Sequence, residues 1–417
     1  MPNWAGISAK QQHEIDRLIT STPTRELPTY DNLSYQDFLS NHLIPNHPFL
    51  LSSFATSKWS SSHDFRLKNL DNSTALPNLS ALRKYAHHVV PVANTLRQEF
   101  SEFERTEKAL GEVLDLWDID EGNGLYVKDW HLMAEIEKEG RGVKEVYQVS
   151  ECLRDDWLNP PYTPDSRIIT SETEVNSAST SDFRFTYLGP PLTYTPLHRD
   201  VYGSYSWSAN IVGRKIWWLF PPDKLDKVKD EYGELVFDVR ELQDEGGAIK
   251  ILQQEGEIIF VPSGWHHQVV NLDFCISINH NFFSSPTLSR IYDTLCNSQE
   301  RVEEAISDVK EMIIGRLGTS DNAWEKEWVE EVQGLLERDA GWNWKGFWTT
   351  IKQNVEMPPA LDHLSPTIEM RNKWIYDIIE RYETRRERIY LEEVQQIIAD
   401  IKMVVGSFSN INTEHLK

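Results

Sequence analysis

Between residues 183 and 283 the chain alternates short apolar stretches with turn signals, and no other feature of the sequence limits the fold as much. Gly213, the Pro221-Pro222-Asp223 run and Gly256 separate the stretches. Strands are expected at Phe183–Leu188, Tyr205–Val212, Lys215–Phe220, Ile249–Leu252, Glu257–Val261, His267–Leu272 and Cys275–Phe283. Many short strands at regular spacing are typical of a closed or double-sheet barrel of the jelly-roll kind. We therefore predict such a barrel here.

The segments before the barrel have mixed patterns. Residues 1–34 are polar and rich in turn formers, so we expect a surface segment with one short helix near Gln11–Ile19. Residues 99–116 have the charge content and period of a helix. Two polar loops, 165–181 and the acidic insertion 223–247, look free to vary and to change substrate access, and the insertion is expected to form a helix followed by a surface loop.

After Pro286 the pattern becomes helical and stays so to the C-terminus. Helices are expected at Leu288–Val309, Trp324–Leu336, Trp342–Ile351 and Thr367–Val405. The chain is therefore predicted to be a mixed α+β protein built on a double-stranded β-helix, that is, a jelly-roll or cupin-like barrel. We expect three parts: a surface segment (1–34), a central domain with an α/β entry (35–285, barrel core 183–285) and a C-terminal helical extension (286–417).

The charge balance bears on the partners. Carboxylates outnumber Lys and Arg by 65 to 42 in 417 residues, which gives a formal charge of −23. Binding to phosphates draws mainly on Lys and Arg, so a nucleic-acid partner is not expected. A basic protein partner suits this field, while the plainer interpretation is that the acidity keeps the chain soluble.

Cysteine usage and hydropathy bear on the compartment. Cys152, Cys275 and Cys296 are widely spaced and form no CxxC pair, so neither a disulfide framework nor a zinc module is expected. The N-terminus lacks a basic head followed by an apolar run, and no stretch has the length and apolarity of a membrane span. We expect a soluble chain without a membrane partner, located in the cytoplasm, with the nucleus as a further compartment.

One constellation in the barrel block has the composition of a metal site. His198 and Asp200 lie two residues apart after a predicted strand, so both can point to one face while Arg199 points away. His267, far downstream, completes two imidazoles and one carboxylate, the ligand set that suits Fe(II) with open coordination positions. We choose His267 over His266, since neighbours on a strand face opposite sides. The plainer alternative makes His198 a surface residue.

An iron site of this kind takes a 2-oxoacid co-substrate, whose distal carboxylate needs a buried cation and hydroxyl donors. Lys215, at the start of an apolar strand, is the predicted cation; the alternative is an edge-strand lysine facing water. Thr195 and Tyr126 are the predicted hydroxyl donors, although Tyr126 also fits a plain core position. Asn279 and Asn281 are candidates for orienting the metal ligands or the co-substrate.

These residues fall within longer motifs of a known family. The motifs are Tyr126-Val127-Lys128-Asp129-Trp130-His131, Gly189-Pro190-Pro191, Thr195-Pro196-Leu197-His198-Arg199-Asp200, Ser206-Trp207-Ser208-Ala209-Asn210, Gly213-Arg214-Lys215, Phe260-Val261-Pro262-Ser263-Gly264-Trp265-His266-His267-Gln268-Val269 and Ser277-Ile278-Asn279-His280-Asn281. From about Tyr35 to the C-terminal helices the sequence resembles the Jumonji-C (JmjC) domain 2-oxoglutarate-dependent oxygenases, and among them the lysyl hydroxylases.

The resemblance implies roles for individual residues. His198, Asp200 and His267 would hold Fe(II). Lys215 would pair with the distal carboxylate of 2-oxoglutarate, with Thr195 and Tyr126 assisting. Ser208, which we also expect at the co-substrate, stands where some members of the family carry Asn near the metal.

The resemblance also implies a reaction. Members of the family use O2 to convert 2-oxoglutarate to succinate while they hydroxylate a substrate carbon. The related lysyl hydroxylases imply a protein substrate, a lysine of the eukaryotic translation termination factor.

Two other interpretations stay open. A lysine demethylase of histones or other proteins would use the same metal chemistry on an N-methyl group, although the zinc modules and basic tracts of chromatin readers are absent from the sequence. A non-catalytic cupin-like interaction protein would keep the barrel as a scaffold, and an intact ligand set with Lys215 argues against it. The sequence leaves the oligomeric state open.

Overall fold

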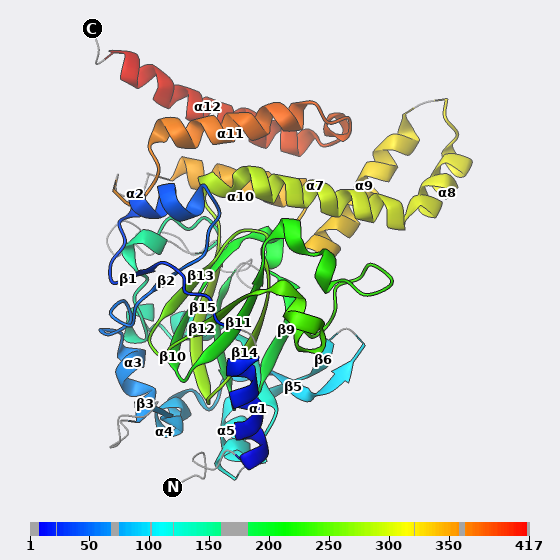
Figure 1. Cartoon of the computed structure of the whole chain (residues 1–417). Helices are drawn as coiled ribbons and strands as arrows, with labels where there is room; N and C mark the ends of the chain where they lie inside the picture. The colour runs from blue at the N-terminus through cyan, green and yellow to red at the C-terminus, as the bar shows by residue number, and fades with distance from the viewer. Residues whose placement is uncertain are drawn as a thin grey trace.

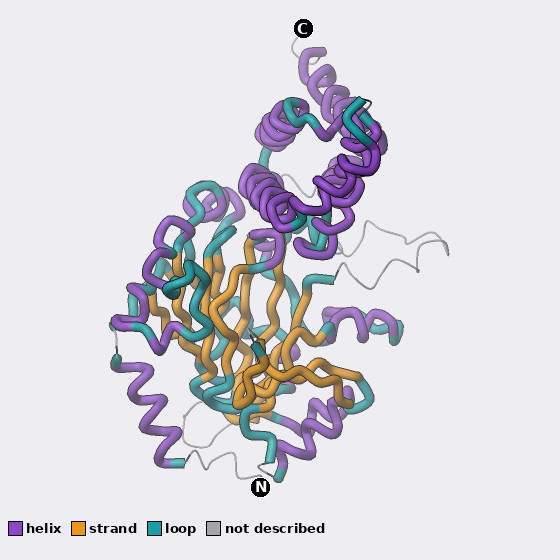
Figure 2. The backbone as a smooth tube through the Cα atoms, turned by 90° about the vertical axis from the view of Figure 1, so that its right-hand side faces the viewer, coloured by secondary structure: helices purple, strands orange, loops and turns teal. Residues whose placement is uncertain are grey.

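The computed structural model describes residues 8–21, 23–67, 75–100, 102–119, 121–159, 182–320, 322–357 and 363–414 (Figure 1). The polar loop 165–181 lies outside these residues. Strands occupy the middle of the molecule and the C-terminal helices gather at one end of it (Figures 1 and 2).

Two sheets form the barrel. The larger sheet has, in spatial order, β1 (Thr29–Tyr30), β2 (Phe49–Leu51), β13 (Ile258–Val261), β10 (Tyr205–Val212), β15 (Cys275–Phe282), β8 (Arg184–Gly189), β7 (Leu125–Trp130), β5 (Val89–Glu99) and β6 (Glu102–Ala109). The smaller sheet has β12 (Ile249–Gln253), β11 (Lys215–Phe220), β14 (His266–Asn271) and β9 (Tyr194–Arg199). Trp217, Leu219 and Ile251 of the smaller sheet share one apolar cluster with Ile259 and Val261 of the larger one. The predicted jelly-roll barrel is confirmed.

Strand β11 is buried on both faces, and this places Lys215 inside. Side chains alternate along a strand, so Lys215, Trp217 and Leu219 share the inner face, whereas Trp218 faces out. The outer face is covered by helix α1 (Ala9–Thr20), whose apolar residues pack on it.

Helix α1 lies where the short helix near Gln11–Ile19 was expected, and most of its residues are exposed. One face is nevertheless buried: Ile15 and Leu18, each 1% exposed, pack against the outer face of β11 together with the partly buried Ile19. Ser8 begins the helix with a capping box. Because few apolar side chains carry the contact, the polar composition of the segment concealed it.

The helix expected over 99–116 is half wrong. Residues Glu102–Ala109 form β6, which pairs antiparallel with β5, and helix α5 (Leu110–Asp118) follows. The charged residues of β6 suit the edge of a sheet. Pairing with β5 overrides a helix-like composition, since strand preference depends strongly on context.

The remaining elements of the central domain are short. They are α2 (Tyr35–Phe38), α3 (Ser60–Asp64), β3 (Arg66–Leu67), β4 (Leu76–Pro77), α4 (Leu79–Leu82) and α6 (Leu132–Lys138). In the insertion 223–247, the expected helix is replaced by 3-10 turns at Asp226–Val228, Val239–Glu241 and Gln243–Gly247. The insertion is tied to the barrel, since the side-chain oxygen of Gln268 accepts a hydrogen bond from the Val239 amide at 2.9 Å.

The C-terminal extension is helical, as predicted, but its divisions differ. Its helices are α7 (Leu288–Ala305), α8 (Ser307–Leu317), α9 (Ala323–Ala340), α10 (Trp344–Glu356), α11 (Ile368–Glu383) and α12 (Glu392–Glu414). The single helix expected over Thr367–Val405 is interrupted between Glu383 and Glu392, so that α12 folds back on α10 and α11. Trp344 and Trp348 are completely buried among these helices.

The helices give no sign of a membrane span. Within the described residues, no helix combines the length and the apolar character that crossing a bilayer requires.

Candidate metal centre

Three predicted ligands meet at one end of the barrel. His198 of β9 lies directly opposite His267 of β14, with ring centroids 4.2 Å apart. Asp200 follows β9 by one residue rather than lying on the strand, and its carboxylate still joins the two imidazoles. One ligand atom from each residue lies within 4.8 Å of the others. A single ion can therefore be reached by all three.

Neighbouring groups set the orientation and the charge state of these three side chains. The two carboxylate oxygens of Asp200 accept hydrogen bonds from Ser206 Oγ (2.6 Å) and Asn281 Nδ2 (3.0 Å), which fix its orientation. His198 Nδ1 lies 2.9 Å from the Pro196 carbonyl, so the ring donates there and keeps Nε2 for a ligand bond. Burial lowers the pKa of His198 to about 3 and also lowers that of His267, so both rings are neutral at pH 7. Two neutral imidazoles and a carboxylate fit Fe(II).

A ladder of polar pairs runs through the barrel from this cluster. Strands β10 and β15 place Ser206 opposite Asn281, Ser208 opposite Asn279, and Asn210 opposite Ser277. Residues two apart on a strand share a face, so the three pairs form one polar track. Ser208 Oγ donates to Asn279 Oδ1 at 3.1 Å. One end of the track touches Asp200 and the other end touches Lys215.

Lys215 is buried, with 2% of its surface exposed. Its ammonium donates to Ser277 Oγ at 2.8 Å, and among the described residues it forms no ion pair with a carboxylate. Burial lowers its pKa to about 8. A cavity of about 450 Å³ joins Lys215 to the three ligands, and Thr195, Tyr126, Ser208 and Asn279 also line it.

Comparison with known proteins agrees with this geometry. Residues 185–282 match the family model described as "JmjC domain, hydroxylase". The chain is 31% identical over 341 residues to "2-oxoglutarate and iron-dependent oxygenase JMJD4" of Gallus gallus, covering 77% of this chain and 72% of the relative. The human protein of the same name is 31% identical over 338 residues, covering 76% and 73%. The chain belongs to the JmjC family of oxygenases.

A third relative has a different name. "Arginine-specific demethylase JMJ20" of Arabidopsis thaliana is 36% identical over 296 residues, which cover 67% of this chain and 62% of that protein. Relatives of similar identity thus carry names for different reactions within the JmjC family.

The two predicted hydroxyl donors lie together in this JmjC cavity. Tyr126 on β7 is 3% exposed and Thr195 on β9 is 7% exposed. Burial raises the pKa of the Tyr126 hydroxyl, while hydrogen bonds with Asn271 and Thr195 act against the rise. The hydroxyl of Tyr126 is thus held in its neutral, donating form.

His266 lies outside the metal cluster of this JmjC protein. It faces Arg199 across the β9–β14 pair, one residue out of step with His267. Its side chain is partly exposed, and burial lowers its pKa to about 4. The alternation along β14 therefore separates the two histidines as expected.

The sequence predicted no role for Ser206, Ser277 and Lys128. Ser206 and Lys128 line the cavity, and Ser277 accepts the hydrogen bond from Lys215. Ser206 and Ser277 belong to strands with a polar residue at every second position, and that pattern is itself a signal of a polar inner face. Lys128 lies two residues after Tyr126 on β7 and lines the same cavity. Its pKa is lowered by burial, and its charge helps to lower the pKa of His198. Alternation along the strand places Lys128 on the same face as Tyr126, and that spacing is a signal that could have identified it.

Proposed function

We propose that this chain is an Fe(II)- and 2-oxoglutarate-dependent protein hydroxylase that oxidises a lysine of the eukaryotic translation termination factor. Family membership supports the oxygenase chemistry, and the lysyl substrate rests on the motif resemblance. The acidic charge of −23 agrees with a substrate segment that carries a cation.

His198, Asp200 and His267 would hold the iron, which supplies the activation of O2 when it is bound. Ser206 and Asn281 keep the Asp200 carboxylate in one orientation, because each oxygen already has a donor. The buried His198 and His267 stay neutral and so bind a cation without first losing a proton.

One observation carries the proposal: a buried lysine with no carboxylate partner in the described residues, in the same cavity as the metal cluster. A buried charge is costly unless it is paired. The distal carboxylate of 2-oxoglutarate would provide that pair for Lys215. Ser277, Thr195 and Tyr126 would donate hydrogen bonds around it.

The substrate would enter on the side of Lys128 and Asp129. Both residues line the cavity, and Asp129 accepts a hydrogen bond from the Tyr187 hydroxyl at 2.8 Å. Asp129 has a φ of 66°, a conformation that non-glycine residues rarely adopt. Such strain is found at sites where a side chain must be aimed, and here it directs a carboxylate to the cavity wall.

We further propose that residues 35–285 act as the catalytic domain and that 286–417 pack on it as a cap. The helical core includes Phe283 from the end of β15 and is extended by Trp157, Leu158 and Tyr202 from the central domain. The ring of Tyr202, two residues after Asp200, stacks on Trp342 with centroids 3.9 Å apart. The cap thus contacts the segment that follows a proposed iron ligand.

A demethylase is the second candidate, since a relative of 36% identity is named an arginine-specific demethylase. It would use the same metal site on an N-methyl group and release formaldehyde. A non-catalytic interaction protein is a weaker candidate, because it would have no use for the buried Lys215.

The test uses the purified chain with Fe(II), 2-oxoglutarate, O2 and two peptides of equal sequence, a termination-factor lysine peptide and its N-methylated form. Mass spectrometry should find one added oxygen on the unmethylated peptide, with equal amounts of succinate. Release of formaldehyde from the methylated peptide without oxygen gain on the other would establish the demethylase instead. The Asp200→Ala protein serves as control, and a wild-type protein that makes no more succinate than this variant would refute both enzymes.

A further inference from the structure

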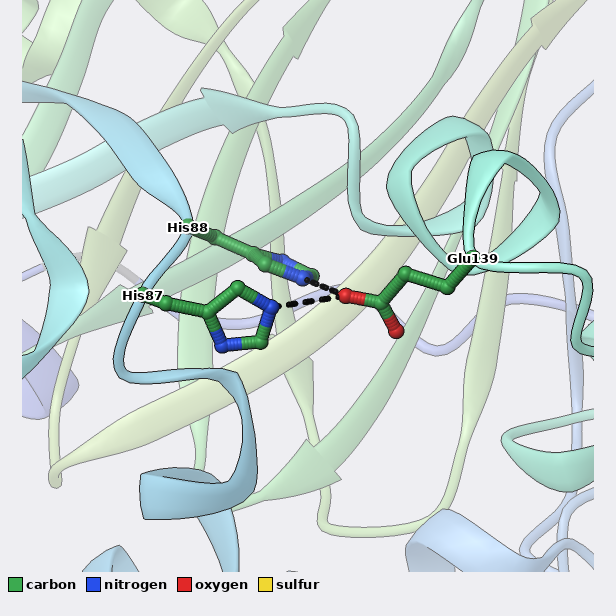
Figure 3. Close-up of side chains that lie close together, drawn as sticks. All are labelled: His87, His88 and Glu139. Atoms are coloured by element: carbon green, nitrogen blue, oxygen red, sulfur yellow. Dashed lines mark hydrogen bonds and ion pairs between the residues drawn. The ribbon is translucent and has the colours of Figure 1, made fainter.

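A second cluster of two histidines and a carboxylate lies outside the barrel. His87 and His88 immediately precede strand β5, and Glu139 caps the C-terminal end of helix α6. Both imidazole Nε2 atoms point to the same oxygen, Glu139 Oε1, each at 2.8 Å (Figure 3). Three ligand atoms therefore converge from two elements that are far apart in the sequence.

Arg141 orients the carboxylate of Glu139 by binding the oxygen that the histidines do not contact. Arg141 donates from a guanidinium nitrogen to Oε2 at 3.1 Å and holds that oxygen away from the histidines. Hydrogen bonds from His88 and His87 lower the pKa of Glu139 to about 2, so the carboxylate is ionised at neutral pH. One oxygen is thus used for orientation and the other is turned to the imidazoles, as for metal-binding carboxylates.

His88 is fixed in its position. It is 4% exposed, and its ring lies edge-on to Trp130 and tilted against Tyr85, at centroid distances of 5.7 and 5.5 Å. Its Nδ1 is buried without a hydrogen-bond partner in the described residues, so Nε2 makes the only polar contact of this ring. His87 differs, because 66% of its side chain is exposed. The cluster therefore combines an immobile buried ligand with one that solvent can reach.

We infer that His87, His88 and Glu139 form a second divalent-cation site, suited to Zn²⁺ and separate from the iron centre. Two imidazoles and a carboxylate are a common zinc ligand set, and the exposed side of His87 leaves room for water as a fourth ligand. Ligands of one Zn²⁺ lie about 3.3 Å apart, given bonds of about 2.0–2.1 Å in a tetrahedron. Each Nε2 now lies 2.8 Å from Glu139 Oε1, so these two distances would have to lengthen by about 0.5 Å to reach that spacing.

The ion would link two parts of the central domain. It would join the start of β5 to the end of α6, and β5 pairs with β7, the strand that carries Tyr126 and Lys128. A ligand that binds only the folded state stabilises it by mass action. The site would therefore act as a structural clip on the outer strands of the larger sheet.

The experiment measures zinc stoichiometry on the full-length chain after removal of metals with EDTA, by competition with a chromophoric chelator at fixed pH. The iron centre also takes Zn²⁺, so the wild type should bind two equivalents. His87→Ala and Glu139→Gln should each lose one equivalent or bind it at least tenfold more weakly, and Asp200→Ala should lose the other. His87 is chosen because an exposed residue can be changed without disturbing the core, whereas buried His88 cannot.

The matched control is His63→Ala, an exposed histidine of α3 that lies in neither cluster. It should bind two equivalents. Zinc should also raise the thermal midpoint of Asp200→Ala by about 2–4 °C, and the double variant with His87→Ala should lose this rise. Equal stoichiometry in the wild type, His87→Ala and Glu139→Gln would overturn the second site. These readouts do not depend on turnover, so they stand apart from the proposed hydroxylase activity.

Discussion

The molecule contains two clusters of the same composition, two histidines and one carboxylate, in very different surroundings. His198 and His267 lie inside the barrel, where neutral donors, Ser206 and Asn281, hold the Asp200 carboxylate. In the second cluster the carboxylate of Glu139 is held by the cation of Arg141, and His87 opens to solvent. Equal ligand types thus support different roles.

The difference teaches what a catalytic centre requires beyond its ligands. The barrel cluster opens into a cavity of about 450 Å³ with a buried cation, Lys215, and a polar track between them. A co-substrate can therefore bind the metal and the lysine together. The second cluster ties a strand to a helix and suits an ion that remains in place.

The largest contrast is expected from removal of one ligand in each cluster. Asp200→Ala should lower succinate formation by more than about a hundredfold, because it removes an iron ligand and leaves its two donors unpaired. His87→Ala should stay within about twofold of wild type in the presence of excess iron. Coupled turnover assays on the two variants check this. Equal losses would mean that the two clusters act as one site.

Removal of the buried cation should separate co-substrate binding from folding. Lys215→Met should raise the KM for 2-oxoglutarate by about 30-fold or more, since truncating one partner of a buried charge pair costs roughly 2–5 kcal/mol. The same change should leave the stability of the ligand-free chain equal or higher, because an unpaired buried charge is removed. Urea unfolding measures the stability, and succinate formation at varied 2-oxoglutarate concentration measures the KM. An unchanged KM would contradict the proposed pair.

The residues behind the carboxylates offer a finer comparison. Asn281→Ala should weaken iron binding by about 10–100-fold, the usual effect of losing a group that orients a ligand. Arg141→Ala should weaken zinc binding at the second cluster by less than about tenfold, since exposed ion pairs contribute little. Metal titration of each variant decides the order. If Arg141→Ala weakened metal binding more than Asn281→Ala, the expected order of the two effects would be wrong.

The mildest perturbation is a change of pH, which should alter co-substrate binding without any substitution. Burial lowers the pKa of Lys215 from 10.5 to about 8, so the ligand-free lysine loses its proton as pH rises through about 8. The carboxylate of 2-oxoglutarate binds the charged form of Lys215, so the affinity should fall about tenfold for each pH unit above this value.

The same pKa shift makes the stability of the ligand-free chain depend on pH. Between about pH 8 and 10.5 the lysine holds more protons in the unfolded chain than in the folded one, so the free energy of unfolding should rise with pH in that window. If the affinity for 2-oxoglutarate stayed constant from pH 7 to 9.5, the lowered pKa of Lys215 would be contradicted.

Sequence reasoning succeeded where a local period determines the structure. The short strands between residues 183 and 283 and the helices after Pro286 follow their patterns because one face of each must be buried. The separation of His267 from His266 follows from alternation along β14, whereas Asp200 reaches the cluster from the turn just after β9. The roles of Lys215, Thr195, Tyr126, Asn279 and Ser208 at 2-oxoglutarate remain predictions, although the structure brings all five to one cavity.

Sequence reasoning failed where pairing or packing with another element overrides local preference. Strand β6 has the composition of a helix, but pairing with β5 fixes it. Helix α1 lies in a polar segment, yet two of its residues complete the burial of β11. The expected helix over Thr367–Val405 is interrupted because α12 packs back on α10 and α11. The partner can be near in the chain, as β5 is to β6, or far from it, as β11 is from α1, and in each case the pattern of the segment alone does not reveal it.

The sequence by itself determined the barrel and the family, since both depend on residue types in short motifs, and it predicted that His198, Asp200 and His267 would come together as iron ligands. Only the tertiary structure decided that Ser206 and Asn281 hold Asp200, that the polar track ends at Lys215, and that His87 and His88 meet Glu139. Apart from the Ser206–Asp200 hydrogen bond, which spans six residues, these contacts join residues far apart in the chain. Whether such side chains meet depends on how the strands and helices pack, and a local sequence pattern does not specify that packing.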